Sequence, residues 1–225
     1  MTEARKLVIV GDSAFAEVAH EYFIHDSNYS VVAFAVEEEY LARDRLQGLP
    51  VVSLDRLEES FSSATHDVYV AVAYAQLNRL RTRLAKKAKE MGYRLASYVS
   101  SRAIVSPSAT VGEHCFIFEG NVVQPFVRIE TNVVLWSGNH VGHHSVIRAN
   151  SFIASHVVVS GYCDIGENAF LGVNAAVANN IRIAPDCWIG PGVVVVDDTQ
   201  RGEIYRAPKV VASKVSALRL FKVGP

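Results

Sequence analysis

An aliphatic residue recurs at every sixth position from Val105 to Val195 without a break. The sixteen positions of this register are Val105, Val111, Ile117, Val123, Ile129, Leu135, Val141, Ile147, Ile153, Val159, Ile165, Leu171, Val177, Ile183, Ile189 and Val195. The residue two positions earlier is small or thin in most repeats, as at Ala109 and Asn121. A period of six fits neither a helix nor a simple strand. It predicts a solenoid, in which each unit buries its apolar side only by stacking on its neighbours.

The repeat resembles that of the hexapeptide-repeat transferases. This resemblance implies a left-handed parallel β-helix with about three hexads in each coil, so that residues about eighteen apart stack on one another. An ordinary β-sandwich is the alternative, and sixteen positions in one register argue against it. Cys115, Cys163 and Cys187 all occupy the small slot of the repeat, which predicts core thiols rather than metal ligands or disulfides.

The composition limits the class of protein. With 225 residues the chain has room for one large or two modest domains, and its net charge of −1 gives no sign of nucleic-acid binding. No apolar run approaches the length of a membrane helix, and the N-terminus shows no apolar core of a signal peptide. We therefore expect a cytoplasmic protein without membrane insertion.

The first hundred residues alternate between apolar runs and helical spacing. A strand-like run at residues 7–10 ends at Gly11, and residues 14–23 then have the apolar spacing of a helix. The start of that helix, at Gly11, Asp12 and Ser13, is a candidate binding site for an anion. Only the first glycine of a dinucleotide-binding GxGxxG motif is present, so a plain turn between strand and helix is an equal alternative.

A second apolar strand, at residues 31–36, leads directly into Glu37 and Glu38. Acidic residues at this place accept hydrogen bonds from a ribose or a base edge in nucleotide-binding folds, although a solvated acidic loop is as good an interpretation. Further strands are expected at residues 50–52, 68–72 and 93–98, and a helix at residues 77–91. This alternation predicts a small parallel sheet with helices on its faces over residues 1–100, followed by the solenoid over residues 101–225.

The whole layout resembles bacterial sugar acyltransferases in which a small Rossmann-like domain precedes the left-handed helix. These include nucleotide-amino-sugar N-acetyltransferases and the sialic-acid O-acetyltransferase group. The segments that carry the resemblance are residues 8–13, 50–52, 109–112 and 143–147. The resemblance implies an acetyl-coenzyme A-dependent acetyltransferase that acts on the amino group of a nucleotide-linked amino sugar, in surface polysaccharide or glycan biosynthesis. A sugar O-acetyltransferase and a catalytically degenerate nucleotide-sugar-binding protein are the alternatives.

Three histidines, His140, His143 and His144, lie near one corner of a predicted coil. Acyl transfer from a thioester needs a base beside the attacking amine or hydroxyl, and imidazole suits that role. In the resembling family the base is a histidine followed by an acidic residue; it falls on His143, and here His144 stands in the acidic position. His143 is therefore the expected base, with His144 and His140 as alternatives. The family's second active-site histidine falls on Phe152, and His156 follows shortly after.

Glycines form the second part of the predicted site. Gly161 should stack one coil above His143, where its backbone N–H is a candidate donor to the thioester carbonyl and its developing oxyanion. Relief of turn strain is the alternative role for this glycine. The other residues expected to bind the pantetheine arm or the nucleotide of coenzyme A are Gly172, Gly190, Pro208 and Lys209.

The resemblance also bears on metals and assembly. Zinc hydratases of this fold use clustered histidines, but no pair here has the spacing of their nearest ligands, so no metal is expected. Family members form trimers with acetyl-coenzyme A between neighbours, which implies a homotrimer with intersubunit sites. Residues 211–223 are expected to form a short helix that caps the open end of the solenoid.

Overall fold

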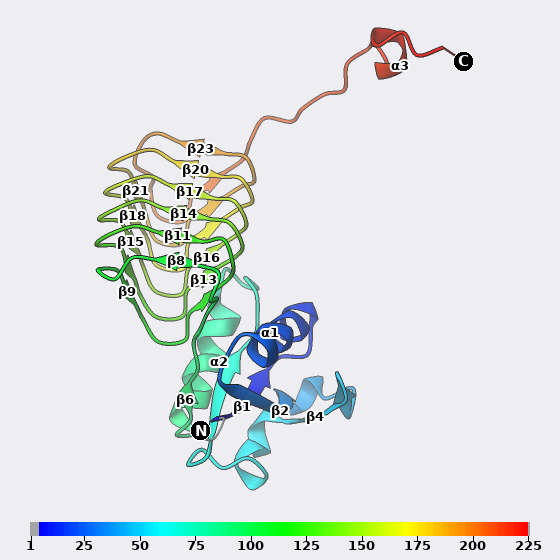
Figure 1. The fold of residues 1–225 in the computed structure, drawn as a ribbon, viewed down its shortest axis with the longest axis vertical. Coiled ribbons are helices and arrows are strands. Elements are labelled where there is room, and N and C mark those ends of the chain that lie inside the picture. Colours follow the sequence, from blue (N-terminus) through cyan, green and yellow to red (C-terminus); the bar gives the residue numbers. More distant parts are fainter. Residues whose placement is uncertain (1–4, 225) are drawn as a thin grey trace.

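The computed structural model describes residues 5–224, which form a sheet with helices on its faces and a tall solenoid above it (Figure 1). The N-terminal sheet has six strands in the order β3-β4-β2-β1-β5-β6. Its strands are β1 (Arg5–Val10), β2 (Tyr29–Val36), β3 (Arg45–Leu46), β4 (Leu49–Ser53), β5 (His66–Val70) and β6 (Arg94–Leu95). All neighbouring pairs are parallel except β3 and β4, so the sheet is mixed rather than purely parallel.

Two helices cover opposite faces of this sheet because successive strand residues point to opposite sides. Leu7 and Ile9 of β1 pack with α1 (Ala14–His25), whereas Val8 and Val10 pack with α2 (Arg79–Glu90). Short 3-10 turns, η1 (Glu38–Tyr40) and η2 (Leu54–Glu59), complete the layer. The predicted strands and helices are present, but residues 93–98 do not form one strand. Their first half is β6, and the chain then enters the solenoid.

The solenoid consists of strands of two residues arranged in three parallel sheets, as a left-handed β-helix requires. Sheet I contains β7 (Tyr98–Val99), β10 (Phe116–Ile117), β13 (Val134–Leu135), β16 (Phe152–Ile153), β19 (Phe170–Leu171), β22 (Trp188–Ile189) and β24 (Ile204–Tyr205). Sheet II contains β8 (Ile104–Val105), β11 (Val122–Val123), β14 (His140–Val141), β17 (Val158–Val159), β20 (Ala176–Val177) and β23 (Val194–Val195). Sheet III contains β9 (Thr110–Val111), β12 (Arg128–Ile129), β15 (Val146–Ile147), β18 (Asp164–Ile165) and β21 (Arg182–Ile183).

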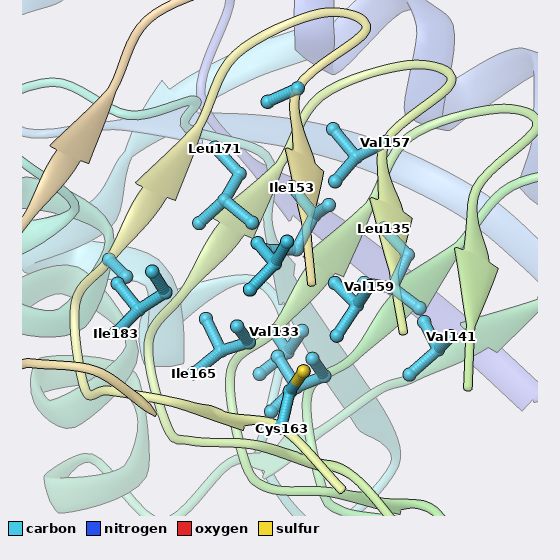
Figure 2. Packing of buried hydrophobic residues seen from close by; sticks show 14 of the residues in the cluster. Val133, Leu135, Val141, Ile153, Val157, Val159, Cys163, Ile165, Leu171 and Ile183 are labelled. Atoms are coloured by element: carbon cyan, nitrogen blue, oxygen red, sulfur yellow. The ribbon is translucent and has the colours of Figure 1, made fainter. Parts of the chain in front are cut away.

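The aliphatic register forms the core of the solenoid, as predicted. The second residue of each strand points inward, and these residues pack in one column of Val, Ile and Leu (Figure 2). From Ile117 to Val195 they are buried, and only Val105 and Val111 in the first coil are partly exposed. Burying such a side chain contributes roughly 1.5–3 kcal/mol, so the repeat supplies most of the driving force of this part. Cys115, Cys163 and Cys187 are free and buried in the same column, which confirms that they are core thiols.

The connections between strands form three corners, named here I–II, II–III and III–I after the sheets that they join. A residue with positive φ stands in nearly every corner, for example Asn132, His144 and Tyr162. Asn is among the residues that tolerate this conformation best, and the III–I corner has Asn132, Asn150 and Asn168 in successive coils. The corners thus stack as columns with residues eighteen positions apart in the sequence.

The outward face of sheet I is aromatic and is covered by the N-terminal part. Phe116 and Phe118 contact Phe15 of α1, and Trp136 lies 5.3 Å from Phe15, measured between ring centroids. Tyr74, which follows β5, packs on Phe170 higher on the same sheet. The two parts of the chain therefore share a continuous apolar core across sheet I.

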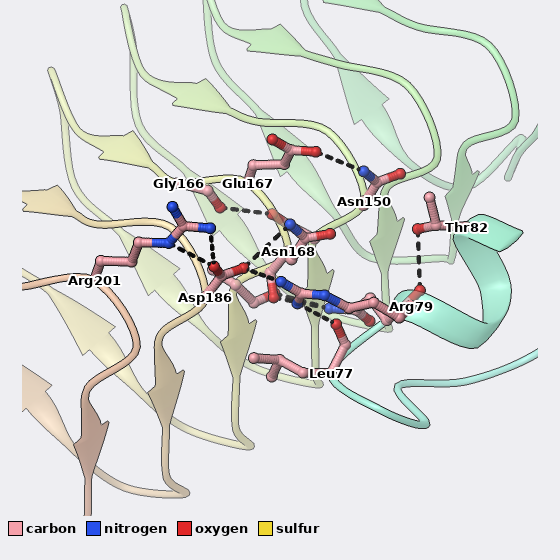
Figure 3. A network of polar contacts seen from close by, with 12 residues as sticks. Leu77, Arg79, Thr82, Asn150, Gly166, Glu167, Asn168, Asp186 and Arg201 are labelled. Carbon is pink, nitrogen blue, oxygen red and sulfur yellow. Dashed lines mark hydrogen bonds and ion pairs between the residues drawn. The ribbon is translucent and has the colours of Figure 1, made fainter.

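A polar cluster anchors α2 to the III–I corner (Figure 3). Arg81 is fully buried, and its guanidinium donates to the carbonyl oxygens of Asn150 and Ala73 and to Oδ1 of Asn132. Arg79 pairs with Asp186, three coils above Asn132. Burial lowers the pKa of Arg81 to about 10, so the group stays charged at neutral pH and the carbonyl oxygens compensate its charge.

The C-terminal tail does not cap the solenoid, so that prediction is wrong. After β24 the chain leaves the last coil and runs away from the body, and only α3 (Ala217–Leu220) is helical (Figure 1). Residues 206–224 are exposed, including Val210 and Phe221. α3 buries no residue and the rest of residues 206–224 is exposed, so no contact within residues 5–224 stabilises a longer helix. No helix within residues 5–224 has the length and apolar character to cross a bilayer.

We predict that the structure loses stability in mild acid through His114. This imidazole accepts the Val70 N–H at Nε2, bonds Asn132 at Nδ1, and is buried, which lowers its pKa from 6.5 to about 3. Below pH ~6.5 the unfolded chain therefore binds a proton at His114 that the folded chain does not bind. The free energy of unfolding should fall by about 1.4 kcal/mol per pH unit from this group below that pH.

His114→Asn is the variant that tests this, because Asn occupies the same corner in the next coils and tolerates positive φ. Urea denaturation between pH 7 and 5 should show a smaller pH slope for the variant than for the wild type. His20, whose pKa burial also lowers, is present in both proteins, so its contribution cancels. An equal slope in the two proteins would contradict the assignment to His114.

Candidate functional site

His143 and His144 lie together on the II–III corner, in the connection that follows β14. His144 has φ 60°, which turns the chain, so the two neighbouring side chains leave the corner in different directions. Their Nδ1 atoms nevertheless lie 3.1 Å apart, and their rings are nearly perpendicular. The backbone N–H of His143 donates to Oε1 of Gln124 in the coil below, which fixes the position of this residue.

The ring of His144 is held between two aromatic side chains of its own column. It stacks on Tyr162 with ring centroids 4.7 Å apart and 13° between the planes, and Phe126 lies 4.7 Å away on the adjacent coil. The edge of Tyr162 also faces His143. Phe126 and Tyr162 are each eighteen positions from His144. The repeat spacing that pointed to Gly161 would therefore have found both, and we did not predict them.

Gly161 lies over His143, as the eighteen-residue spacing predicts. A Cβ placed on Gly161 would lie 2.9 Å from Cε1 and 3.0 Å from Nε2 of His143, so the glycine makes room for the imidazole. Its N–H is not free in this structure, because it donates to Oδ1 of Asn179 at 2.9 Å. An acyl carbonyl would have to replace that amide oxygen in order to use this donor.

The other candidate histidines lie elsewhere on the solenoid. His140 points outward from sheet II and is half-buried, and His156 lies on the I–II corner with its ring over Gly138. Phe152 is buried in sheet I and packs against Tyr74, so the N-terminal part covers this position. Within residues 5–224 no group of three His, Cys, Asp or Glu side chains is arranged to hold a metal ion.

The predicted acceptor-binding residues largely meet in one pocket at the carboxyl ends of β1 and β2. Gly11, Asp12, Ser13 and Glu37 line it together with Tyr40, and its volume is about 330 Å³. Gly11 has φ 122°, and a Cβ there would lie 2.9 Å from the carbonyl oxygen of Ala71, so only glycine fits this close approach. Ser13 precedes α1 as its N-cap but makes no side-chain capping bond, which leaves its hydroxyl unused by the helix.

The acidic residues after β2 separate in the structure. Glu37 accepts two hydrogen bonds of 2.7 Å from Arg83, which chiefly lower its pKa, and it also pairs with Lys87. Glu38 does not line the pocket; it pairs with Arg56 of η2. Glu37 is therefore a charged residue already bound by two cations, and a ligand at this edge meets Arg83 as well as the carboxylate.

The residues expected to bind coenzyme A do not form one site within the chain. Gly172 and Gly190 stand on the I–II corner, whereas Gly161 stands on the II–III corner. The space beside these two glycines is filled, because a Cβ on Gly172 would lie 2.7 Å from the backbone of the next coil and Trp188 lies beside Gly190. Gly192 on the same corner has open space, since no atom lies within 4 Å of a Cβ placed there. Pro208 and Lys209 lie in the exposed tail, away from the corners.

The pocket is lined by the N-terminal part, whereas the histidine pair lies on the II–III corner of the solenoid. The N-terminal part packs on sheet I and on the III–I corner, through residues such as Phe15 and Arg81. The II–III corner is the edge opposite sheet I in a coil of three sides. The pocket lining and the histidine pair therefore have no residue in common and lie on different parts of the chain.

Comparison with solved structures finds close likeness over nearly the whole chain. The acetyltransferase domain of PglB from Neisseria gonorrhoeae superposes with a TM-score of 0.79 and 26% identity, covering 89% of this chain and 95% of that one. The same domain is known in complex with acetyl coenzyme A. PerB from Caulobacter crescentus, in complex with CoA and GDP-perosamine, superposes with a TM-score of 0.78 and 27% identity, covering 88% and 92%. The sequence matches no protein-family model and no curated protein sequence.

We predict that Gly161→Ala displaces the imidazole of His143. The three atoms nearest to an added Cβ all belong to that ring, and the backbone of Gly161 is not in the left-handed region, so the fold itself tolerates alanine. The melting temperature should stay within about 3 °C of the wild type, as for a mild surface change. The chemical shifts of His143 in spectra of ¹⁵N-histidine-labelled protein should move, and those of His20 and His114 should not. Unchanged His143 signals would contradict the contact.

Proposed function

We propose that this chain, an acyltransferase with the architecture of bacterial sugar acetyltransferases, transfers the acetyl group of acetyl-coenzyme A to the amino group of a nucleotide-linked sugar. The observation that carries the proposal is the His143 imidazole over Gly161 on an exposed corner of a solenoid of this kind. The likeness to a perosamine N-acetyltransferase bound to CoA and GDP-perosamine supports an amino group as the acceptor and a nucleotide as its carrier.

In this proposal His143 is the general base. The amine nitrogen attacks the thioester carbonyl carbon, and its proton passes to Nε2 of His143 as the carbon–nitrogen bond forms. The carbon–sulfur bond then breaks, and the proton leaves with the thiol of coenzyme A. The Gly161 N–H, released from Asn179, donates to the carbonyl oxygen while negative charge develops there.

The pocket at Gly11, Asp12 and Ser13 binds the nucleotide in this proposal. A helix N-terminus attracts phosphate, and here α1 begins directly at the pocket. Arg83 and Arg43, which pair with Glu37 and Asp12, add positive charge at the same edge. The Rossmann-like description of this part is supported by the parallel order of β4, β2, β1 and β5, whose direction of winding reverses at β1.

We further propose a homotrimer whose active sites lie between chains. Within one chain the nucleotide pocket belongs to the N-terminal part, which packs on sheet I, and His143 lies on the II–III corner. In this proposal the sugar therefore reaches the II–III corner of a neighbouring chain. The exposed outward face of sheet II supports this, because Ile104, Val158 and Val194 there are apolar and uncovered. A closed cyclic arrangement would bring each pocket to the next chain's corner in the same way.

A turnover assay over a panel of amino-sugar nucleotides and their hydroxyl counterparts tests the reaction. Release of the coenzyme A thiol with amino sugars alone supports N-transfer. Release with hydroxyl acceptors alone would identify an O-acetyltransferase, and absence of turnover with measurable nucleotide-sugar binding would identify a binding protein.

We predict that His143→Asn lowers kcat by about 10²- to 10⁴-fold, as loss of a general base does. Asparagine fits the corner sterically but cannot take a proton at neutral pH. The affinity for acetyl-coenzyme A, measured by calorimetry, should change little. His140→Asn and His156→Asn serve as matched controls, since these histidines lie on sheet II and on the I–II corner, and each should keep most of the activity. Near-normal kcat in His143→Asn would refute the assignment of the base.

We predict that two inactive variants restore activity when they are refolded together. Ser13→Trp should block the nucleotide pocket, because Ser13 is exposed at its mouth, and His143→Asn removes the base. In randomly mixed trimers with sites between chains, about one quarter of the sites would combine an open pocket with an intact base. Recovery of activity toward this fraction is the expected result. No recovery, with mixed trimers demonstrated by mass spectrometry, would place each site within one chain.

A further inference from the structure

We propose that His144 is a positioning residue that accepts a hydrogen bond from Nδ1 of His143 and so fixes the tautomer in which His143 is a base. This proposal rests on the proposed function, and it concerns a position where the resembling family has an acidic residue. The structure offers a different acceptor there, an imidazole nitrogen held at hydrogen-bond distance.

The distance between the two Nδ1 atoms restricts where protons can be. At 3.1 Å the two nitrogens share a hydrogen bond only if one carries a proton and the other presents a lone pair. If neither were protonated, two lone pairs would face each other, and if both were, two N–H groups would. The pair therefore exists in one of two arrangements, and each has a different base.

In the first arrangement His143 is protonated at Nδ1 and donates to His144, which leaves Nε2 of His143 free to take a proton. In the second arrangement His144 is the donor, and the free nitrogen is its own Nε2. Nε2 of His143 lies over Gly161, 3.0 Å from the place of an added Cβ, and the residue is exposed. The first arrangement thus places the free nitrogen beside the backbone N–H that would bind the acyl oxygen, and the geometry points to it.

The surroundings of His144 hold its ring in the plane that this hydrogen bond needs. Tyr162 stacks on one side and Phe126 packs in the coil below, whereas His143 stands nearly perpendicular to the ring of His144. A lone pair of imidazole lies in the ring plane, so fixing that plane aims Nδ1 of His144 at its neighbour. The same column carries Asn180 and Ser108 in other coils, which could not form such a stack.

An imidazole acceptor differs from a carboxylate because one proton on its acceptor nitrogen turns that nitrogen into a donor. Tyr162 and Gln124 are the polar side chains that face the pair, and no ion pair or hydrogen bond joins a charged side chain to it within residues 5–224. When both imidazoles are protonated the hydrogen bond is lost.

Three substitutions at His144 separate its role as a hydrogen-bond acceptor from its stacking on Tyr162. Oδ1 of Asn or Asp stands at the same number of bonds from the backbone as Nδ1 of His, so both keep an acceptor and lose the stack. Phe keeps the stack and loses the acceptor, and the column tolerates it at positive φ, as Phe126 shows. We expect His144→Asn to keep kcat within about threefold, and His144→Phe to lose about tenfold or more, as for loss of an orienting partner.

His144→Asp should keep kcat as well, since its carboxylate oxygen accepts the hydrogen bond from His143. Normal kcat in His144→Phe, with loss in His144→Asn, would show that stacking alone matters and would overturn the proposal. A large loss in His144→Asn together with near-normal kcat in His143→Asn would make His144 the base and overturn the proposal. Melting temperatures of each variant identify any loss that comes from misfolding.

A spectroscopic readout needs no substrate and so separates this proposal from the proposed function. Long-range ¹H–¹⁵N spectra of ¹⁵N-histidine-labelled enzyme should show His143 protonated at Nδ1 and His144 protonated at Nε2 at pH 8, with signals assigned from the His143→Asn and His144→Phe variants. In His144→Phe the signal of His143 should shift toward the Nε2-protonated form. The opposite tautomers in the wild type would overturn the proposal even if the enzyme acetylates an amino sugar. The expected tautomers in a protein without turnover would leave the pairing intact and reject the function alone.

Discussion

The stacking of one coil on the next, through parallel strands only two residues long, is the constraint on which the rest of the structure depends. Each strand is too short to be stable alone, so its hydrogen bonds and its inward aliphatic residue gain their effect only in the column. The register of six therefore cannot drift, since a shift by one residue would turn the aliphatic side chain outward. This rigidity carries the II–III corner, where Gly161, His143 and Gln124 hold fixed positions in successive coils.

The N-terminal part packs on one face of the solenoid and forms hydrogen bonds along one of its corners. Its aromatic side chains cover sheet I, and α2 binds the III–I corner, where corner residues of several coils present amide and carbonyl oxygens at regular steps. Arg81 pairs with no carboxylate within residues 5–224, so its charge is compensated by backbone carbonyl oxygens and by the side-chain amide oxygens of Asn132 and Asn78. The segment before α2 is shaped to permit this, since Gln76, Leu77 and Asn78 all adopt positive φ. Backbone strain of this kind persists only where surrounding contacts hold it.

The sequence predicts the solenoid because its six-residue repeat is local and strict. It predicts the order of strands and helices in the N-terminal part because the spacing of apolar residues differs between the two. It also brought Gly11, Asp12, Ser13 and Glu37 to one pocket and placed Gly161 over His143. It failed where tertiary packing decides. A glycine predicts free space where a side chain would stand. At Gly172 the backbone of the next coil fills that space, and at Gly190 Trp188 does. The Arg81 anchor depends on partners 51 and 69 positions away in the chain, which no local pattern predicts. Asn179 lies eighteen positions from Gly161, so the repeat spacing would have found that contact.

The three cysteines of the solenoid core acquire a chemical meaning from the proposed reaction. An enzyme that consumes a thioester releases a thiol at every turnover, and exposed protein thiolates attack the disulfide form of such a thiol in thiol–disulfide exchange. Each of these cysteines is buried, and its sulfur contacts a backbone carbonyl oxygen of the next coil, as Cys115 does with Glu130 at 3.1 Å. Burial raises the pKa of Cys115 to about 11, which keeps it in the unreactive thiol form. The fold thus keeps the cysteine thiols of the core from reacting with coenzyme A and its disulfides.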